Sequence, residues 1–406
     1  MGLWDWLLGR ITPDKFAAMM IDAMRQAGLE DSIEYNEDSF SLRVGESRRI
    51  NLANAYREYR EAPSNVRHQV VEHYAFGVFV SPRELTPDDF SDAAPNLRPV
   101  VRGRMYPEYV RMQAEIDDDP WVETPSRVIG EHFVEMLAWD MPNRIVYLPE
   151  SRLDAWGVSV EEAFDVAHEN IRAIGGAFEG TTGHIYVGAW DDSYAASRIV
   201  TPQMIRKLQV QGKPVVALPN AEFLIVAGTD DDEALLHMGK MISEAEREPK
   251  FESGLVLSLE DEGWRPFLPS EDSDAYELLY RHRVASMWRD YDEQQRLLEE
   301  VYAKRGLDIH VATFAAHEDR LTHRLSTVTI WTEGLVALLP RAQNVAFMGG
   351  DPDDPTMLGA ASWQRVVDVA GDRIRETDLW PERWRVESFP TQQQLDAMEL
   401  EESAAG

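Results

Sequence analysis

Two adjacent aspartates, a serine and an arginine stand in the segment 190–198, which reads WDDSYAASR. The segment follows a predicted strand (184–187) and precedes a predicted helix (194–208), so its polar groups would gather at a strand end. Carboxylates in such a place could hold a cation or a substrate. An aspartate there also caps a helix through the free amides of the first turn, and the arginine then forms an ion pair. The second interpretation is the more typical one. The residues concerned are Asp191, Asp192, Ser193 and Arg198.

A second group of candidate site residues is basic. Arginines recur between positions 98 and 111, interleaved with tyrosines, in a chain with 72 Asp and Glu against 40 Lys and Arg. A guanidinium group binds carboxylate or phosphate through paired N–H donors, so this cluster could hold an anion. Pairing with the protein's own acidic surface is the more common arrangement and is kept as the alternative. The arginines are Arg98, Arg102, Arg104 and Arg111.

No metal centre and no cofactor are predicted. The chain has no cysteine, which excludes thiolate-bound zinc and iron–sulfur clusters. His317 and His323 are six residues apart, whereas a spacing of four would bring both imidazoles to one helical face. His132 and Glu135, three apart, form too short a motif to indicate zinc. The glycines within 175–183 lack the order of a phosphate-binding loop, and the acidic runs lack the ligand spacing of an EF-hand.

The composition indicates which classes of partner the protein can bind. The net charge of -32 and the pI near 4.6 argue against nucleic acid and against anionic lipid, both of which attract clustered Lys and Arg. A hydrophobic content of 44% indicates a folded chain despite this charge. The apolar run within residues 1–11 is shorter than the roughly 20 residues of a membrane span. We therefore expect a cytoplasmic protein, with a protein partner favoured over a small molecule.

Helical and alternating patterns divide the chain into three units. Residues 1–92 read as a small helix–hairpin–helix domain, 97–267 as a central domain and 270–398 as a C-terminal domain, with acidic, proline-containing connectors near 85–96 and 262–275. The short acidic end, 399–406, is predicted to be disordered. Strands and helices do not alternate regularly, which favours an α+β fold of two or three small mixed-sheet layered domains without a doubly wound parallel sheet. The longest helical pattern covers 274–302, and a glycine interrupts another within 154–173.

Several segments in the middle of the chain carry a family resemblance: 147–150, 156–158, 161–164, 170–172, 190–198 and the predicted hairpin 214–228. With them the chain resembles the YtpQ-like family of uncharacterised bacterial proteins. The resemblance covers roughly residues 10–267, is best from about 140 onward, and leaves out the C-terminal third. It implies a domain layout but neither an activity nor catalytic residues.

These observations favour a non-catalytic binding or adaptor protein, either chaperone-like or a neutralising partner of a basic protein. The alternative is an enzyme with an acidic site at the strand-to-helix turn 190–198. No nucleophile elbow or kinase motif supports a particular reaction.

Overall fold

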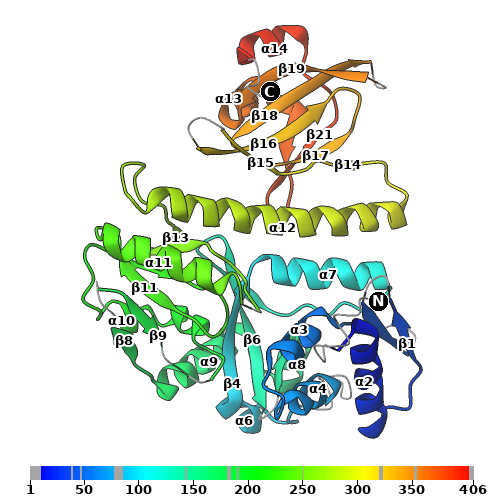
Figure 1. Ribbon diagram of the computed structural model, residues 1–406, viewed down its shortest axis with the longest axis vertical. Helices are drawn as coiled ribbons and strands as arrows, with labels where there is room; N and C mark the ends of the chain where they lie inside the picture. Colours follow the sequence, from blue (N-terminus) through cyan, green and yellow to red (C-terminus); the bar gives the residue numbers. More distant parts are fainter. Residues whose placement is uncertain are drawn as a thin grey trace.

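The computed structural model describes residues 11–37, 40–45, 48–76, 86–141, 144–180, 184–188, 190, 192–248, 250–319, 323–351 and 354–401. Within these ranges the chain forms helices and several small sheets whose strands pair mostly antiparallel, and no sheet is doubly wound. The predicted α+β class is therefore confirmed. Figure 1 shows the long helix α12 lying between the C-terminal unit on one side and the N-terminal and central units on the other.

The N-terminal unit packs helices on an antiparallel sheet of order β1-β2-β3. The hydroxyl of Thr12 accepts a hydrogen bond from the amide of Lys15 and so caps the first helix. Phe16 and Met20, one helical turn apart, are fully buried and pack with Leu42 of the sheet. The elements are α2 (Pro13–Gln26), β1 (Ile33–Asn36), β2 (Ser41–Val44), β3 (Arg48–Asn51), α3 (Ala53–Glu61) and α4 (Arg67–Phe76).

The central unit begins with a sheet built around β6. Strand β4 pairs along one side of β6, while β5 and β7 pair one after the other along its other side. Gly157, with φ +69°, separates α8 from α9 as the sequence predicts. The elements are α6 (Phe90–Ala93), η1 (Ala94–Asn96), β4 (Leu97–Gly103), α7 (Met105–Asp117), β5 (Ser126–Ile129), β6 (Phe133–Met141), β7 (Arg144–Tyr147), α8 (Glu150–Trp156) and α9 (Val160–Ile174).

The second sheet of the central unit is antiparallel, of order β13-β12-β10-β11-β9-β8. One face packs on α11 and α12, and the other packs on side chains of β4, β5 and β6. The elements are β8 (Phe178–Gly180), β9 (Tyr186–Gly188), η2 (Ala196–Val200), α10 (Pro202–Ile205), β10 (Pro214–Ala217), β11 (Ile225–Gly228), α11 (Asp232–Ala245), β12 (Val256–Glu260) and β13 (Gly263–Pro266).

Two predictions in this unit need correction. The helix expected over 194–208 is instead the short helices η2 and α10, because Thr201 takes φ -113° and ψ 62° before Pro202 and breaks the helical run. The connector expected near 85–96 is partly helical, since residues 90–96 form α6 and η1. Asn170 of α9 donates to the carbonyls of Ala94 and Leu97, which fastens that segment to the central unit.

Helix α12 (Tyr276–Arg305) extends for 30 residues over the predicted 274–302 and ends at Gly306, which has φ +67°. It packs on α7 and α11 of the central unit and on the start of the C-terminal unit. Buried Arg383 joins the helix to that unit: its guanidinium donates to the side chain of Gln294 and to the carbonyls of Ala312 and Leu338. Helix α12 therefore packs against both the central unit and the C-terminal unit.

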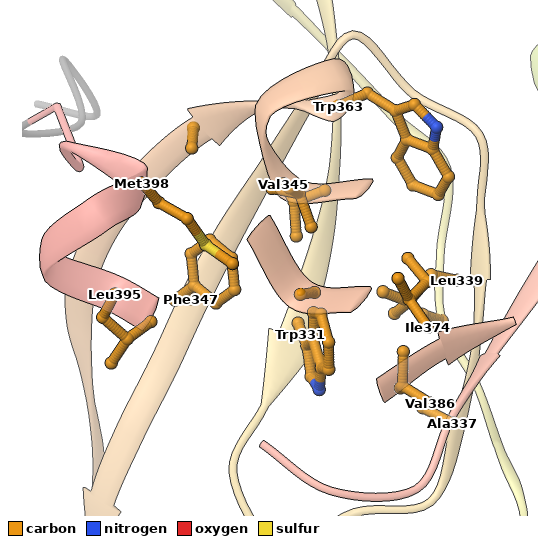
Figure 2. Close-up of a cluster of buried hydrophobic side chains, with 14 residues drawn as sticks. Trp331, Ala337, Leu339, Val345, Phe347, Trp363, Ile374, Val386, Leu395 and Met398 are labelled. Atoms are coloured by element: carbon orange, nitrogen blue, oxygen red, sulfur yellow. The ribbon is translucent and has the colours of Figure 1, made fainter. Parts of the chain in front are cut away.

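The C-terminal unit holds two sheets, of order β14-β17-β21-β20 and β15-β16-β18-β19. Figure 2 shows its core, in which Trp331 and Phe347 lie among smaller apolar side chains and Leu395 and Met398 come from the last helix. The elements are β14 (His310–Val311), β15 (Ala315–Glu318), β16 (Leu325–Thr332), β17 (Ala337–Pro340), β18 (Asn344–Asp351), β19 (Asp354–Ser362), α13 (Trp363–Ala370), η3 (Gly371–Arg373), β20 (Ile374–Glu376), β21 (Arg383–Val386) and α14 (Gln392–Met398).

Residues 399–401, which belong to the segment 399–406 that was predicted to be disordered, are ordered instead. Leu400 packs against the core of the C-terminal unit, and Glu401 pairs with Ala360 through two backbone hydrogen bonds. Burial of an apolar side chain outweighs the acidic character of its neighbours there. Residues 402–406 lie outside the described part of the chain.

Candidate functional site

The segment 190–198 is organised by an ion pair. Arg198, whose side chain is only 1% exposed, donates to both carboxylate oxygens of Asp192 at 3.0 and 2.6 Å. The same guanidinium donates to the carbonyl of Gly175 and lies 4.3 Å from the ring centre of Trp190. Asp192 also accepts from the amide of Tyr194 at 3.0 Å. These contacts hold the turn together.

The electrostatics of Asp192 agree with that geometry. Burial favours its neutral form, but the hydrogen bonds from Arg198 and Tyr194 outweigh burial and lower the pKa of the carboxyl. Ser193 is exposed and has φ +58°. Asp191 lies outside the described residues. The expected helix cap at this position is therefore a turn closed by Asp192.

Arg98 belongs to the same polar cluster. Tyr194 donates from its hydroxyl to Asp140 at 2.8 Å, and the other carboxylate oxygen of Asp140 lies 4.0 Å from the Nε of Arg98. Burial and the carboxylate of Asp140 raise the pKa of Tyr194, and Arg98 and Arg102 oppose that rise. Arg98 also donates to two backbone carbonyls near the start of β4. The structure thus brings together the predicted residues Arg98, Asp192 and Arg198.

Arg102 lies further along the same face of β4. Its side chain is 3.6 Å from Glu252 and hydrogen-bonds Tyr147, which is also hydrogen-bonded by Tyr106. Burial raises the pKa of Glu252, an effect that Arg102 partly offsets. The residues on this face are called the arginine–tyrosine network: Arg98, Arg102, Tyr106, Asp140, Tyr147, Tyr194 and Glu252.

Arg104 and Arg111 lie outside this network and line a neighbouring groove. The guanidinium of Arg104 lies 4.1 Å from the ring centre of Trp380 in the C-terminal unit and donates to the backbone carbonyl of Glu131. Arg111 forms an ion pair with Glu108 within α7. The four predicted arginines therefore do not form one anion site, since each contacts a different set of groups.

Two tyrosines of the arginine–tyrosine network also line a groove that the sequence patterns did not predict. The groove, called the α7–β5 groove, encloses about 340 Å³ between α7 and strand β5. Tyr106 and Tyr147 belong to both the network and the groove. Large apolar side chains in the groove wall are exposed to solvent: Tyr106, Val110, Trp121, Val122 and Val128.

The sequence carried a weak signal for this groove. Trp121 and Val122 follow Pro120 in a segment without a helical or alternating pattern, and Trp121 is 44% exposed. A large apolar pair in a loop has no core to enter, which marks a contact surface. Together with Val128, which is 54% exposed on β5, the pair forms an exposed apolar part of the groove wall.

Comparison with family models, with curated proteins and with solved structures finds no match for this chain. The resemblance to the YtpQ-like family stays a prediction. In the described ranges, no helix is long and apolar enough to cross a membrane. The same part of the chain brings no three His, Asp or Glu side chains together in a way that could hold a metal ion.

Proposed function

We propose that the chain is a non-catalytic binding or adaptor protein of the cytoplasm that holds an extended segment of another protein in the α7–β5 groove. The observation that carries this proposal is the cluster of exposed apolar side chains in the groove wall, among them Trp121, Val122 and Val128. Folded proteins seldom leave such side chains grouped and open to water unless a partner covers them.

Strand β5 supports an extended occupant. Among the described strands it pairs with β6 alone, so its other edge has no strand partner. An extended peptide can add to such an edge through backbone hydrogen bonds, while its alternate side chains enter the adjacent groove. Val128 on β5 and Trp121 beside it would receive those apolar side chains.

The charge of the protein supports a basic occupant. With a net charge of -32, the surface attracts cationic segments and repels acidic ones. In the groove wall Glu123 is exposed, Glu108 is neutralised by Arg111, and Arg104 lies against the ring of Trp380, so the preference for a cation comes from the net charge of the protein. We therefore infer that the preferred segment alternates apolar residues with Lys or Arg.

The alternative function, an enzyme with an acidic site in 190–198, gains no such support. Both oxygens of Asp192 accept from Arg198, and one also accepts from Tyr194. A carboxylate with its lone pairs occupied in this way is a poor general base. That alternative stays a prediction that activity measurements on Asp191 and Asp192 variants can address.

The experiment is a selection of random peptides displayed on phage, followed by fluorescence anisotropy with labelled synthetic peptides. We expect enrichment of alternating apolar–basic sequences and at least about tenfold weaker binding by Trp121→Ser, the loss that follows from removing one aromatic anchor. Trp288→Ser is the matched control, since Trp288 is 46% exposed on α12, outside the groove.

Any one of three outcomes would overturn the proposal. The first is that no peptide is enriched over a blank selection. The second is that enriched peptides bind the wild type, Trp121→Ser and Trp288→Ser with the same dissociation constant. Weaker binding by Trp288→Ser alone would place the occupant on α12 and would equally contradict the groove.

A further inference from the structure

A second cavity lies where the central unit, α12 and the C-terminal unit meet. It encloses about 630 Å³, a volume typical of small-molecule sites, and such sites favour domain boundaries. Its walls come from the turn before β6, from the first half of α12 and from loops of the C-terminal unit. We call it the interunit cavity; the residues that matter below are His132, Tyr276, Tyr280, Arg283, Gln343 and Trp380.

His132 is the most unusual residue in its wall. The side chain is buried, with 4% exposed, and neither ring nitrogen has a hydrogen-bond partner within the described residues. Burial, followed by the nearby charges of Arg283 and Arg104, lowers its pKa to about 3, so the imidazole is neutral. A neutral imidazole has one N–H donor and one acceptor, and here both are unused. A buried polar group without a protein partner can bind a water, an ion or a polar atom of a ligand.

A second unused donor stands beside the first. The indole Nε1 of Trp380 is buried and has no hydrogen-bond partner in the described ranges, and its ring centre lies 5.7 Å from that of His132. The turn that presents His132 is formed by Gly130 and Glu131, both with positive φ. Two orphan donors from different units therefore lie at the same cavity wall.

The charged side chains of the cavity wall are two arginines, Arg283 and Arg341, and two glutamates, Glu131 and Glu382. No carboxylate in the described part of the chain forms an ion pair with Arg283, although it acts on the pKa of His132, Tyr276 and Tyr280. Arg341, by contrast, is paired with Glu382 at 3.0 Å. Arg283 lines the cavity and forms no ion pair among the described residues, although the chain has a net charge of -32. Its guanidinium is therefore suited to bind an anion.

Aromatic and apolar side chains form another part of the wall, beside the polar side chains of Thr327 and Gln343. The rings of Tyr276 and Tyr280 are parallel, with an interplanar angle of 3° and centres 5.6 Å apart. Phe314 stacks on Tyr291, and Met287 lines the cavity between them and the central unit. Flat apolar walls bind aromatic or other planar molecules.

We propose that the interunit cavity binds a small planar apolar molecule that carries an oxyanion, either carboxylate or phosphate. The guanidinium of Arg283 binds the oxyanion, His132 and Trp380 donate to polar atoms of the ligand, and the tyrosines face its planar body. The site is independent of the proposed function, because neither Trp121 nor Val128 lines this cavity.

The test uses three probes that share a naphthalene ring: 1-naphthoate, 1-naphthyl phosphate and the uncharged 1-naphthalenemethanol. Isothermal titration calorimetry with the full chain at pH 7.5 measures each dissociation constant. We expect at least one anion to bind about tenfold or more tighter than the alcohol, since a guanidinium–oxyanion contact contributes a factor of this size. The preferred anion then separates a carboxylate ligand from a phosphate ligand.

Variants on the same helix locate the binding. Arg283→Gln should weaken the tighter anion by about tenfold. Arg296→Gln is the matched control, because Arg296 lies on α12 and is held by Glu293 and Glu300. Gln343→Glu keeps nearly the shape of the side chain and adds a negative charge to the cavity wall. This second variant should therefore also weaken the binding of the anion. Trp121→Ser should bind as the wild type does.

The proposal fails if the alcohol binds as tightly as both anions. It also fails if no probe binds with a dissociation constant below about 1 mM, a free energy of binding of about -4 kcal/mol. A third contrary result is that Arg283→Gln and Gln343→Glu both bind the anions as the wild type does. Loss of binding in Trp121→Ser would instead place the probes in the α7–β5 groove and would overturn it as well. Circular dichroism of each variant verifies that it is folded.

Discussion

We expect the substitution His132→Leu to make the fold less sensitive to acid, because the native structure holds this imidazole in its neutral form. Burial is the main cause, and the charges of Arg283 and Arg104 add to it, so that the pKa of His132 is about 3 instead of 6.5. Unfolding exposes the imidazole to water, where it takes up a proton below about pH 6.5. Leucine is apolar and of similar size, and it does not titrate.

The sign and size of the effect follow from proton linkage. Below pH 6.5 the unfolded chain binds a proton at His132 that the native chain does not, so the free energy of unfolding falls as the pH falls. Each pH unit costs about 1.4 kcal/mol, and between pH 6.5 and 4 the native imidazole stays neutral, so the loss is about 3 kcal/mol. Above pH 6.5 the imidazole of His132 is neutral in both the native and the unfolded chain, so no free energy of unfolding is lost through it.

Urea unfolding at pH 7.5, 6, 5 and 4 measures this effect. Any pH dependence that comes from the 72 Asp and Glu residues is shared by the wild type and His132→Leu. The difference between the two free energies of unfolding therefore isolates His132. Exposed His317, changed to leucine, is the control. If the difference between wild type and His132→Leu stays constant from pH 7.5 to pH 4, the native imidazole is not held neutral and the reasoning is refuted.

Two further predictions concern buried arginines. Asp192→Ala should lower the free energy of unfolding by about 3 kcal/mol, because it leaves the buried Arg198 without its carboxylate. Asp192→Asn should cost less, since its amide oxygen still accepts from Tyr194; a melting temperature above that of the wild type would contradict the ion-pair role. Arg383→Met should cost about 3–5 kcal/mol in urea unfolding, since it leaves Gln294 and backbone carbonyls without their buried donor; an unchanged midpoint would show that Arg383 does not join α12 to the C-terminal unit.

Local patterns predicted much of the fold. The helix expected over 274–302 corresponds to α12, and its apolar residues face α7, α11 and the C-terminal unit. The break at Gly157 and the hairpin over 214–228 are also where the sequence places them, because glycine and turn residues act over a few positions. The prediction of one helix over 194–208 was wrong, because Thr201 and Pro202 interrupt a segment whose composition is otherwise typical of a helix.

The candidate site was harder to predict because its contacts join distant positions. Asp192 and Arg198 were singled out from their types, but their pairing places both in a turn rather than at a helix start. Tyr194 donates to Asp140, 54 residues away, and Arg102 pairs with Glu252 in the loop before β12. Residue type indicates which side chains can pair, while the partner depends on how the sheets pack.

The same reasoning explains why His132 and Arg283 carried no signal. His132 and Glu135 look like a motif, yet β6 begins at Phe133 and sends Glu135 to His168 on α9, while His132 lines the interunit cavity. Several described arginines form ion pairs with carboxylates, whereas Arg283 forms none in the described part of the chain and lines the interunit cavity. The proposed role of Arg283 depends on its place in that wall, and the wall exists only once three units have packed around the cavity.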